Sequence, residues 1–390
     1  MKKVIFRGPV LTQSGYGVHS RQVVRWLLSR NDIDVKFLVT PWGDTPWILN
    51  RSYCDGLIGR IMERTASPDY KADVSFQLQL PNEWDPKLCP INIGITAAVE
   101  TDCANQSWVV DSNKMSCIVL PSTHSLKSLE NAGSLTVDSY VIPESFSDDV
   151  IKNVDRTIDL SYIETSFNFL LFGQMTGNNP FNDRKNLLFT IKWICEAFEK
   201  DNDVGIIIKT NAGRNTLIDR NIVIRNLDAL LKEVRSKSKN PKVYLLHGDM
   251  SDADVATLYK HQKVKALVSL TRGEGYGLPI LEAAASGLPV IATGWSGHLD
   301  FMKHVKFLSV EHKLTQIHQS RVDDKIFMKN SKWAEPIEED FKKKIIKFRS
   351  STSMPKEWAT QGISKIHELY SHNAVSKVYD EKLSRFLVNS

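Results

Sequence analysis

Residues 264–302, VKALVSLTRGEGYGLPILEAAASGLPVIATGWSGHLDFM, contain the pattern that decides the fold. Two short apolar runs, at 266–270 and 290–293, are typical of buried strands in a parallel sheet. The segment between them predicts a helix, because Pro279 suits a first helical turn and Gly287 suits the left-handed residue that follows a last turn. The unit is therefore a strand, a glycine loop, a short helix and a second strand.

The glycine loop predicts an anion site. Gly273, Gly275 and Gly277 allow the backbone to approach a ligand closely, and the N–H groups at the following helix start favour a phosphate. Glu274 lies in the loop and Glu282 about one turn into the helix, so both carboxylates are expected to face one pocket. Since they would approach different parts of an extended ligand, hydroxyl binding at two places is favoured over a hydrolase acid/base pair.

Glu274, seven intervening residues and Glu282, within RGEGYGLPILEAAASGLPVIAT, resemble the E-x7-E signature of family 4 retaining glycosyltransferases. The resemblance implies the GT-B fold, an α/β architecture of two Rossmann-like domains that face each other across a cleft. In that family the first Glu contacts the donor sugar and the second contacts the ribose. The helix N-terminus holds the diphosphate of a nucleotide sugar. An ordinary βαβ unit with two surface acids is the alternative.

Composition narrows the class of protein. A length of 390 residues predicts about two domains, and 42% hydrophobic with 24% charged residues is typical of a globular protein. The net charge of +5 suits a phosphate-bearing substrate but not the basic stripe of a nucleic-acid binder. Five scattered cysteines predict a reducing compartment. Because the N-terminus runs directly into a strand and no window approaches about 18 apolar residues, neither a signal peptide nor a membrane span is expected.

The chain opens with a second strand, glycine loop and helix. Residues 4–6 are apolar, Gly15 and Gly17 lie in the loop, and residues 18–28 show helical apolar spacing. By position the two glycines match a loop that faces the donor phosphates in the resembled family. The helix carries arginines beside its apolar stripe, so it either packs on the core or lies on a membrane.

A catalytic candidate follows one strand of this half. Strand candidates lie at 35–39, 74–80, 91–99, 118–120 and 140–142. Glu100 comes directly after the third of these, at the carboxyl end where open α/β sheets bind ligands. Many of the resembled enzymes carry a His in this region, whereas one subgroup carries W-E-T-D, which this chain approaches as Val99-Glu100-Thr101-Asp102. Glu100 is therefore a catalytic candidate, with capping of the next helix as the alternative.

Basic residues follow the strands of the second half, which are expected at 169–172, 204–209 and 243–246. Arg184 and Lys185 stand at a helix start, where their side chains can reach phosphate oxygens. The family usually has an Arg after the first of these strands; Gln174 replaces it here, so Arg184 and Lys185 are expected to supply the charge. A solvated helix start is the alternative. Lys209 ends the second strand and is another candidate.

The turn His247-Gly248-Asp249-Met250 precedes a helix expected at 252–260. The resemblance implies that the nucleobase packs against this loop, with Gly248 and Met250 as backbone contacts. The pairs Asp201-x-Asp203 and Asp252-x-Asp254 are expected to cap helices rather than to bind a metal.

Four features lie in the C-terminal part of the chain, from Trp295 onward. Trp295-Ser296-Gly297-His298 predicts a loop, with His298 as a satisfied surface His, and the segment WAEP at 333–336 resembles a stretch of the W-E-T-D subgroup. Residues 341–349 are basic and amphipathic, which indicates a solvated face or contact with an acidic membrane surface. In the GT-B fold the last helix, at about 373–386, would cross back to pack on the N-terminal domain.

The sequence therefore predicts an acceptor-binding Rossmann-like domain at 1–155, a donor-binding Rossmann-like domain at 156–365, and a returning helix at 366–390. We expect a retaining hexosyltransferase that needs no metal or cofactor and moves a sugar from a UDP- or GDP-linked donor to a carbohydrate, lipid-linked or other acceptor. The expected location is cytoplasmic, either free or peripheral at the inner membrane face, with no nucleic-acid partner. A non-catalytic sugar-nucleotide-binding protein of the same fold and a sugar-nucleotide epimerase are the alternatives.

The predicted catalytic residues are Glu274, Lys185, Arg184 and Glu100. The predicted donor-binding residues are Gly15, Gly17, Lys209, Gly248, Met250, Gly275, Tyr276, Gly277, Leu278 and Glu282.

Overall fold

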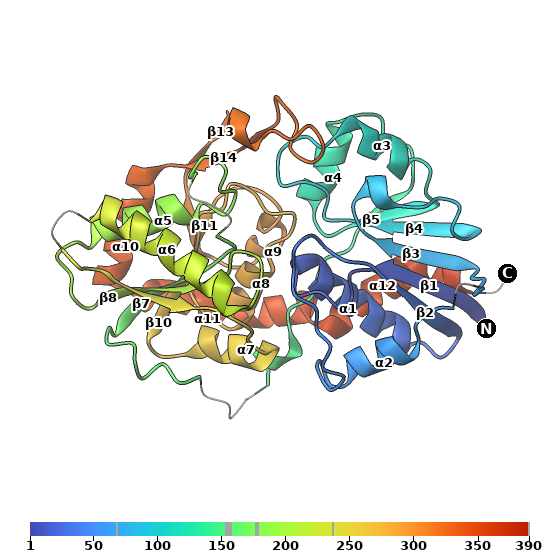
Figure 1. Cartoon of the computed structure of the whole chain (residues 1–390), viewed down its shortest axis with the longest axis horizontal. Coiled ribbons are helices and arrows are strands. Elements are labelled where there is room, and N and C mark those ends of the chain that lie inside the picture. The colour runs from blue at the N-terminus through green and yellow to red at the C-terminus, as the bar shows by residue number, and fades with distance from the viewer. Residues whose placement is uncertain (68, 153–157, 176–178, 236–237, 389–390) are drawn as a thin grey trace. The chain divides into compact units, whose positions relative to one another are not determined.

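The structure is a computed structural model that describes residues 1–388 except for 68, 153–157, 176–178 and 236–237. The chain forms two compact units (Figure 1). Unit 1 consists of Met1–Ser145, Asp323–Ser331 and His372–Ser390, and unit 2 consists of Phe146–Val322 and Lys332–Ser371. Each unit is built around a 6-stranded parallel sheet.

The sheet of unit 1 has the order β2-β1-β3-β4-β5-β6, with every neighbouring pair parallel. Its strands are β1 (Lys2–Gly8), β2 (Ile33–Val39), β3 (Val74–Leu78), β4 (Ile91–Ile95), β5 (Cys117–Leu120) and β6 (Ser139–Val141). The helices of this unit are α1 (Gly15–Ser29), α2 (Leu57–Glu63), α3 (Gln106–Ser112), α4 (Thr123–Glu130) and α12 (His372–Leu387), with a 3-10 turn η1 (Pro81–Glu83). All strands expected in this half are present, although those predicted to reach 80 and 99 end at Leu78 and Ile95.

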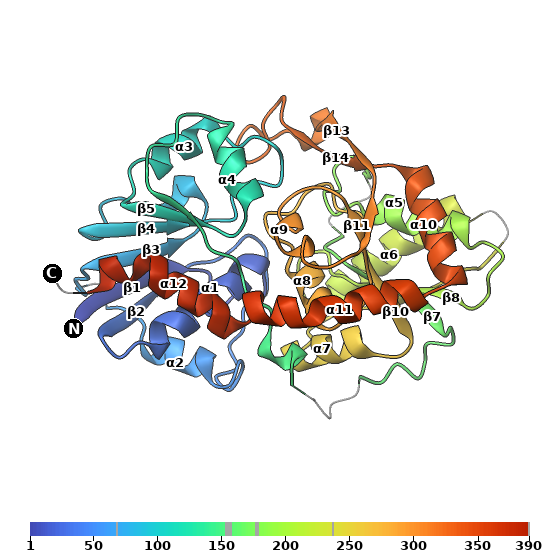
Figure 2. The ribbon, with the colours of Figure 1, turned by 180° about the vertical axis from the view of Figure 1, so that it is seen from behind.

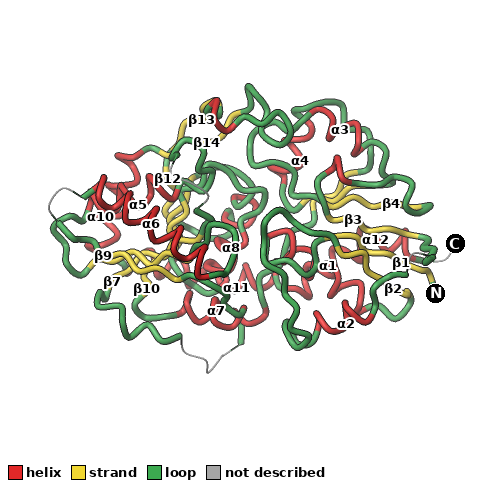
Figure 3. Tube along the Cα trace, viewed as in Figure 1, coloured by secondary structure: helices red, strands yellow, loops and turns green. Residues whose placement is uncertain are grey.

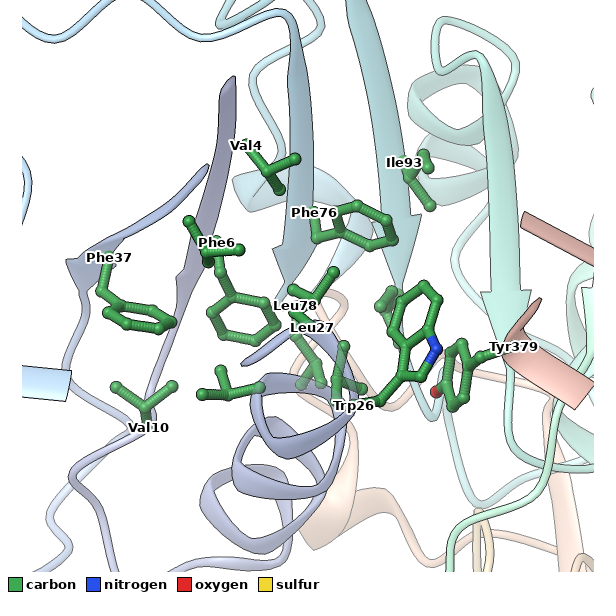
Figure 4. Packing of buried hydrophobic residues seen from close by; sticks show 14 of the residues in the cluster. Val4, Phe6, Val10, Trp26, Leu27, Phe37, Phe76, Leu78, Ile93 and Tyr379 are labelled. Carbon is green, nitrogen blue, oxygen red and sulfur yellow. The ribbon is translucent and has the colours of Figure 1, made fainter. Parts of the chain in front are cut away.

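The C-terminal helix α12 packs on α1 within unit 1, as Figure 2 shows from behind. Trp26 of α1 is 1% exposed and stacks on Tyr379 of α12 with 4.9 Å between ring centroids. The indole N–H of Trp26 donates to the carboxylate of Asp380 at 3.0 Å. In Figure 4 the Trp26 ring lies between Phe76 of β3 and Tyr379. The predicted return of the last helix to the N-terminal half is therefore confirmed.

The first change of unit falls between Ser145 and Phe146, not at 155/156, a position that lies outside the described residues. The reason is visible in the hydrogen bonds on either side. Gln22 of α1 both donates to the carbonyl of Ser145 at 2.6 Å and accepts from its amide at 2.9 Å. The amide of Phe146 instead donates to the carbonyl of Tyr370 in unit 2 at 3.3 Å.

The other predicted domain limits also need correction. The chain returns to unit 1 at His372 rather than at 366, because α11 (Ser353–Tyr370) continues in unit 2 and packs on its core. The sequence analysis did not predict that Asp323–Ser331 belongs to unit 1. In that segment Phe327 is buried, and the carbonyl of Lys325 accepts from the side-chain amide of Asn105 at 3.1 Å.

The sheet of unit 2 has the order β12-β11-β10-β7-β8-β9, again parallel throughout. Its strands are β7 (Phe167–Phe172), β8 (Val204–Lys209), β9 (Lys242–Leu246), β10 (Val264–Ser269), β11 (Val290–Thr293) and β12 (Leu308–Val310). The remaining helices are α5 (Leu187–Ala197), α6 (Leu217–Val234), α7 (Asp252–Lys260), α8 (Leu278–Ala285), α9 (Leu299–Met302) and α10 (Glu338–Ser350), with 3-10 turns η2 (Asp148–Val150) and η3 (Gln319–Arg321). An antiparallel hairpin, β13 (His312–Gln316) and β14 (Lys332–Pro336), completes the unit.

Helices cover both faces of this sheet, which explains its continuous apolar strands (Figure 3). Successive residues point to opposite faces. Phe169, Ile206 and Val268 pack in one core with α5, α6 and α10, whereas Leu170 and Ile207 pack in a second core with α7, α8 and α11.

Neither of the two amphipathic helices uses its apolar face for a membrane. Val23, Val24 and Leu27 of α1 are buried, so the membrane alternative for this helix is wrong. The apolar face of α10, around Phe341 and Ile345, is also buried, while Lys342, Lys344 and Arg349 pair with neighbouring carboxylates. In the part of the chain that the structure describes, no helix has the length and hydropathy needed to cross a bilayer.

Candidate functional site

The predicted donor residues of unit 2 gather at the carboxyl ends of its parallel strands. The loops that follow β7, β9 and β10 carry Lys185, Gly248 and Glu274, respectively, and Lys209 is the last residue of β8. Parallel strands place these loops at one edge of the sheet, where open α/β folds bind ligands.

The glycine loop and α8 have the predicted geometry. Gly277 precedes α8 with a φ of 102°, a left-handed value that favours glycine, and a side chain there would also lie 3.2 Å from Cβ of His298. Pro279 lies in the first turn of α8, and Gly287 follows its end with a φ of 72°. The helix start and stop that the sequence predicts are therefore confirmed.

Glu274 is a buried carboxylate held by two cations. Its Oε1 accepts from Nζ of Lys185 at 2.6 Å, and its Oε2 lies 3.5 Å from Nη1 of Arg184. Burial alone would raise its pKa, but Lys185 and Arg184 outweigh burial and lower the pKa of Glu274 to about 2. Glu274 is therefore ionised throughout the neutral range.

Arg184 and Lys185 do not form a solvated helix start. Their side chains are only 22% and 25% exposed, and both are directed at the glycine loop. Arg184 also donates to the carbonyl of Gly273 at 2.7 Å, while its own carbonyl accepts from the amide of Arg272 at 2.8 Å. The structure thus brings together Arg184, Lys185 and Glu274, which come from two different loops.

The loop at 294–298 binds the backbone of Glu274, a contact that was not predicted from the sequence. Ser296 Oγ accepts from the amide of Glu274 at 2.9 Å, and the amide of Gly297 donates to its carbonyl at 2.9 Å. A side chain at Gly297 would lie 2.2 Å from the carbonyl oxygen of Gly275, so only glycine fits there. The signal in the sequence was the glycine in Trp295-Ser296-Gly297-His298, which indicated a close backbone approach.

His298 is satisfied, as predicted, but it is not a surface residue. It is 0% exposed, and its Nε2 lies 2.8 Å from the carbonyl oxygen of Thr293. Burial lowers the pKa of His298, so the ring is neutral. The surface assignment was wrong because the packing of this loop under Glu274 cannot be read from the sequence.

Glu282 has neighbours different from those of Glu274. Its carboxyl accepts from the hydroxyl of Tyr259 at 3.2 Å. Burial, with a smaller contribution from Asp252, raises the pKa of Glu282 to about 8. Below that pH the carboxyl is mostly protonated. At neutral pH Glu274 is therefore ionised whereas Glu282 is mostly uncharged, a difference that the expectation of one shared pocket did not anticipate.

Lys209, Gly248 and Met250 lie together at the ends of β8 and β9. The ammonium of Lys209 donates to the carbonyl of Gly248, and burial lowers the pKa of Lys209. Gly248 has a φ of 98°, and open space surrounds the position of a missing side chain. Met250 and His247 line a pocket of about 440 Å³ beside this loop.

Three further predicted donor-binding residues, Tyr276, Gly275 and Leu278, lie in the glycine loop and at the start of α8. Tyr276 is 3% exposed, and its ring lies 5.2 Å from that of Phe301 in the core, so its side chain is not available to a ligand. Gly275 packs against Gly297. Leu278 is the first residue of α8 and packs on the core.

The remaining predicted residues lie in unit 1. Gly15 begins α1, and no atom lies within 4 Å of the position that a side chain would take. Gly17 has a structural role instead, since a side chain there would lie 2.1 Å from the carbonyl oxygen of Thr12. Glu100 lies in the loop after β4, and the capping alternative is wrong because Asn105 caps α3.

Metal ligands are not gathered anywhere in the described ranges: no three His, Cys, Asp or Glu side chains cluster there. The D-x-D pairs have other roles. Asp254 forms a capping box with Ser251 at α7, as predicted. The helix cap expected of Asp201-x-Asp203 is wrong, because Asp203 accepts from the amide and hydroxyl of Ser166 and pairs with Arg349.

Comparisons with known proteins agree with this geometry. Residues 225–320 match the model of the family described as glycosyl transferases group 1. A 67-residue stretch is 40% identical to the serotype-specific mannosyltransferase WbdA of Escherichia coli. This stretch is 17% of the chain and 8% of the relative, so the chain matches only a small part of that protein's length.

Solved structures resemble the whole chain. Anabaena Alr3699/HepE, in complex with UDP and glucose, has a TM-score of 0.66 at 13% identity over 99% of this chain and 100% of its own. A glycosyltransferase from Rickettsia africae ESF-5 has a TM-score of 0.66 at 14% identity, covering 100% and 99% of the two chains. The sucrose-phosphate synthase of Thermosynechococcus elongatus has a TM-score of 0.64 at 11% identity, covering 99% of each.

These likenesses show the GT-B fold, with its two Rossmann-like domains, that the sequence predicts. The matched residues 225–320 include the glycine loop, Glu274 and Glu282.

Proposed function

We propose that this protein is a retaining glycosyltransferase that moves a hexose from a nucleotide-sugar donor to a carbohydrate or lipid-linked acceptor. The observation that carries the proposal is the 2.6 Å contact between Lys185 and Glu274 beside the N-terminus of α8. Unit 2 binds the donor and unit 1 binds the acceptor. The first donors to test are UDP-glucose, because HepE was solved with UDP and glucose, and GDP-mannose, because the WbdA relative is a mannosyltransferase.

Each group in unit 2 has a task in this proposal. The N–H groups at the start of α8 and the ammonium of Lys185 stabilise the diphosphate as it leaves with negative charge. The ionised Glu274 orients Lys185 and accepts from a hydroxyl of the donor sugar. Glu282 binds the ribose, and the pocket beside His247 and Met250 receives the nucleobase. The cations come from side chains and a helix, so the proposed transfer needs no metal.

The proposal is tested with a panel of UDP-, GDP- and ADP-sugars. A donor that binds should raise Tm, because a ligand of the folded state stabilises it by mass action. Incubation of that donor with candidate acceptors should release nucleoside diphosphate, and NMR should show the anomeric configuration of the donor retained in the product. EDTA should leave turnover unchanged. Donor binding without transfer to any acceptor would contradict the proposed enzymatic function. A product with inverted anomeric configuration would contradict the retaining mechanism.

Replacement of Glu282 by alanine should weaken nucleotide binding by about 10- to 150-fold. This range corresponds to the loss of a carboxylate hydrogen bond of about 1.5–3 kcal/mol to a ribose hydroxyl. The pKa of Glu282 is about 8 without ligand, so its carboxyl is mostly protonated at pH 7. Binding of a ribose to the ionised form should therefore release the carboxyl proton into solution. Calorimetry in two buffers with different ionisation enthalpies measures both the affinity and the released proton.

Glu282→Gln is the matched control, because it keeps the size of the side chain and cannot release a proton. A folded-state pKa raised above the unfolded value favours folding at low pH, and this stability is lost as the pH rises through about 8. The Gln variant should therefore have a higher Tm than the wild type at pH 9. Unchanged nucleotide affinity in a folded Glu282→Ala variant would show that the ribose role is wrong.

A further inference from the structure

We infer that Arg272 and Glu335 form a positioning pair that holds Arg184 and Lys185 at Glu274. Its kinetic consequence rests on the proposed function, whereas its structural consequence does not. Arg272 comes two residues before Glu274, and Glu335 is 63 residues away from Arg272 in the sequence.

The guanidinium of Arg272 makes four hydrogen bonds within the protein. Its Nε and Nη2 donate to the carboxylate of Glu335 at 2.8 and 2.7 Å, a bidentate pair. Its Nη1 donates to the carbonyl oxygens of Pro180 and Asp183 at 2.6 and 2.8 Å. Arg272 is 1% exposed, so these partners replace water around the charge.

Three distant segments meet at this residue. The amide of Arg272 donates to the carbonyl of Arg184 at 2.8 Å, and its carbonyl accepts from the amide of Ala334 in β14 at 2.9 Å. The guanidinium also lies 5.8 Å from the ring of Phe189 and 5.1 Å from that of Trp333. Arg272 therefore links three segments: the loop before α5, the loop that carries Glu274, and strand β14.

These links matter because the proposed sugar transfer depends on the positions of two flexible cationic side chains, Arg184 and Lys185. Arg184 and Lys185 are carried by the end of the loop that Arg272 binds at Pro180 and Asp183. A displacement of about 1 Å at a positioning contact can lower a rate by about 100-fold. Lysine cannot replace Arg272, since an ammonium group cannot bind a carboxylate and two carbonyl oxygens with a planar fork.

The test compares Arg272→Lys with Arg349→Lys. Arg349 is a matched control because it also binds a carboxylate through two nitrogens, at 2.9 and 3.4 Å from Asp201, and lies over an aromatic ring, Phe167. We expect Arg272→Lys to lower kcat at least tenfold with little change in the KM for the donor. Glu335→Gln, which keeps one acceptor oxygen for the guanidinium, should cause a smaller loss of kcat, and Arg349→Lys should leave kcat unchanged.

Hydrogen exchange of the ligand-free protein tests the structural part without any assay of transfer. Amides at 183–190 should exchange faster in Arg272→Lys than in Arg349→Lys. If the wild type transfers no sugar, the proposed function fails while this exchange still decides the positioning role. Wild-type exchange at 183–190 in folded Arg272→Lys or, in an active enzyme, equal losses of kcat in the Arg272 and Arg349 variants would overturn the inference. If Arg272→Lys does not fold, the same measurements on Glu335→Gln decide it.

Discussion

Glu274→Gln is expected to lower the turnover of sugar transfer at least 100-fold. The amide keeps the shape of the carboxylate but removes the charge that orients Lys185 and Arg184. Hydrogen bonds to charged groups contribute about 1.5–3 kcal/mol each, and about 1.4 kcal/mol corresponds to a factor of ten in rate. Steady-state kinetics with a saturating donor measure the effect.

Glu164→Gln is the control for Glu274→Gln. Glu164 also pairs with a lysine of unit 2, Lys242, but at an exposed position. Its replacement should change turnover little, since exposed ion pairs contribute about 0–1 kcal/mol. Wild-type turnover in a folded Glu274→Gln variant would remove Glu274 from the proposed mechanism.

The same residue predicts how the stability of the protein depends on pH. The pKa of Glu274 is lowered from 4.5 to about 2, so its contribution to stability is full above the unfolded pKa and is lost as the pH falls through about 2. The contribution at neutral pH is on the order of 3 kcal/mol. The Tm of the wild type should therefore fall more steeply between about pH 5 and 2 than that of Glu274→Gln, which thermal unfolding across this range measures.

Much of the fold could be predicted because buried parallel strands are apolar on both faces. The runs FLLF in β7 and IIIK in β8 show this pattern, and Pro279 and Gly287 mark the ends of α8. The hairpin of β13 and β14 could not be predicted in this way. Its strand His312–Gln316 is mostly exposed, so it lacks the pattern of a buried strand.

The candidate site could be predicted only where its residues are close in sequence. Glu274 was found from its glycine loop, but its contacts with Arg184 and Lys185 span 90 and 89 residues. The raised pKa of Glu282 depends on burial and then on Asp252, neither of which local spacing reveals. Arg272 was passed over because an arginine beside glycines resembles a loop residue, although the acid in the WAEP segment offered a signal.

Lys185→Ala should lower turnover by about 100-fold or more, and it should also lower stability at neutral pH because the buried Glu274 loses its nearest cation. In the ligand-free protein Lys185 neutralises Glu274, and during transfer its charge is directed at the diphosphate. Arg184→Ala should lower stability as well, because Arg184 also binds the carbonyl of Gly273. Kinetics and thermal unfolding of the same variants separate the two effects.

Lys192→Ala on α5 is the matched control for this variant. Lys192 lies 3.8 Å from Glu196 one helical turn later, a pair on the helix surface. Its replacement should leave turnover unchanged. Full activity in an Arg184→Ala/Lys185→Ala double variant would remove both residues from the proposed mechanism.

The pH profile of Lys185→Ala distinguishes a charge partner of Glu274 from a residue that only contacts the donor. Burial raises the pKa of Glu274 and Lys185 opposes it, so the variant should have a Glu274 pKa well above 2. The carboxyl would then ionise within the assay range, and kcat should rise with pH between about 4.5 and 7. The wild type should lack this limb, because its Glu274 is already ionised there. A variant that is slow but has the wild-type profile would show that Arg184 alone keeps Glu274 charged, and that Lys185 acts only on the leaving diphosphate.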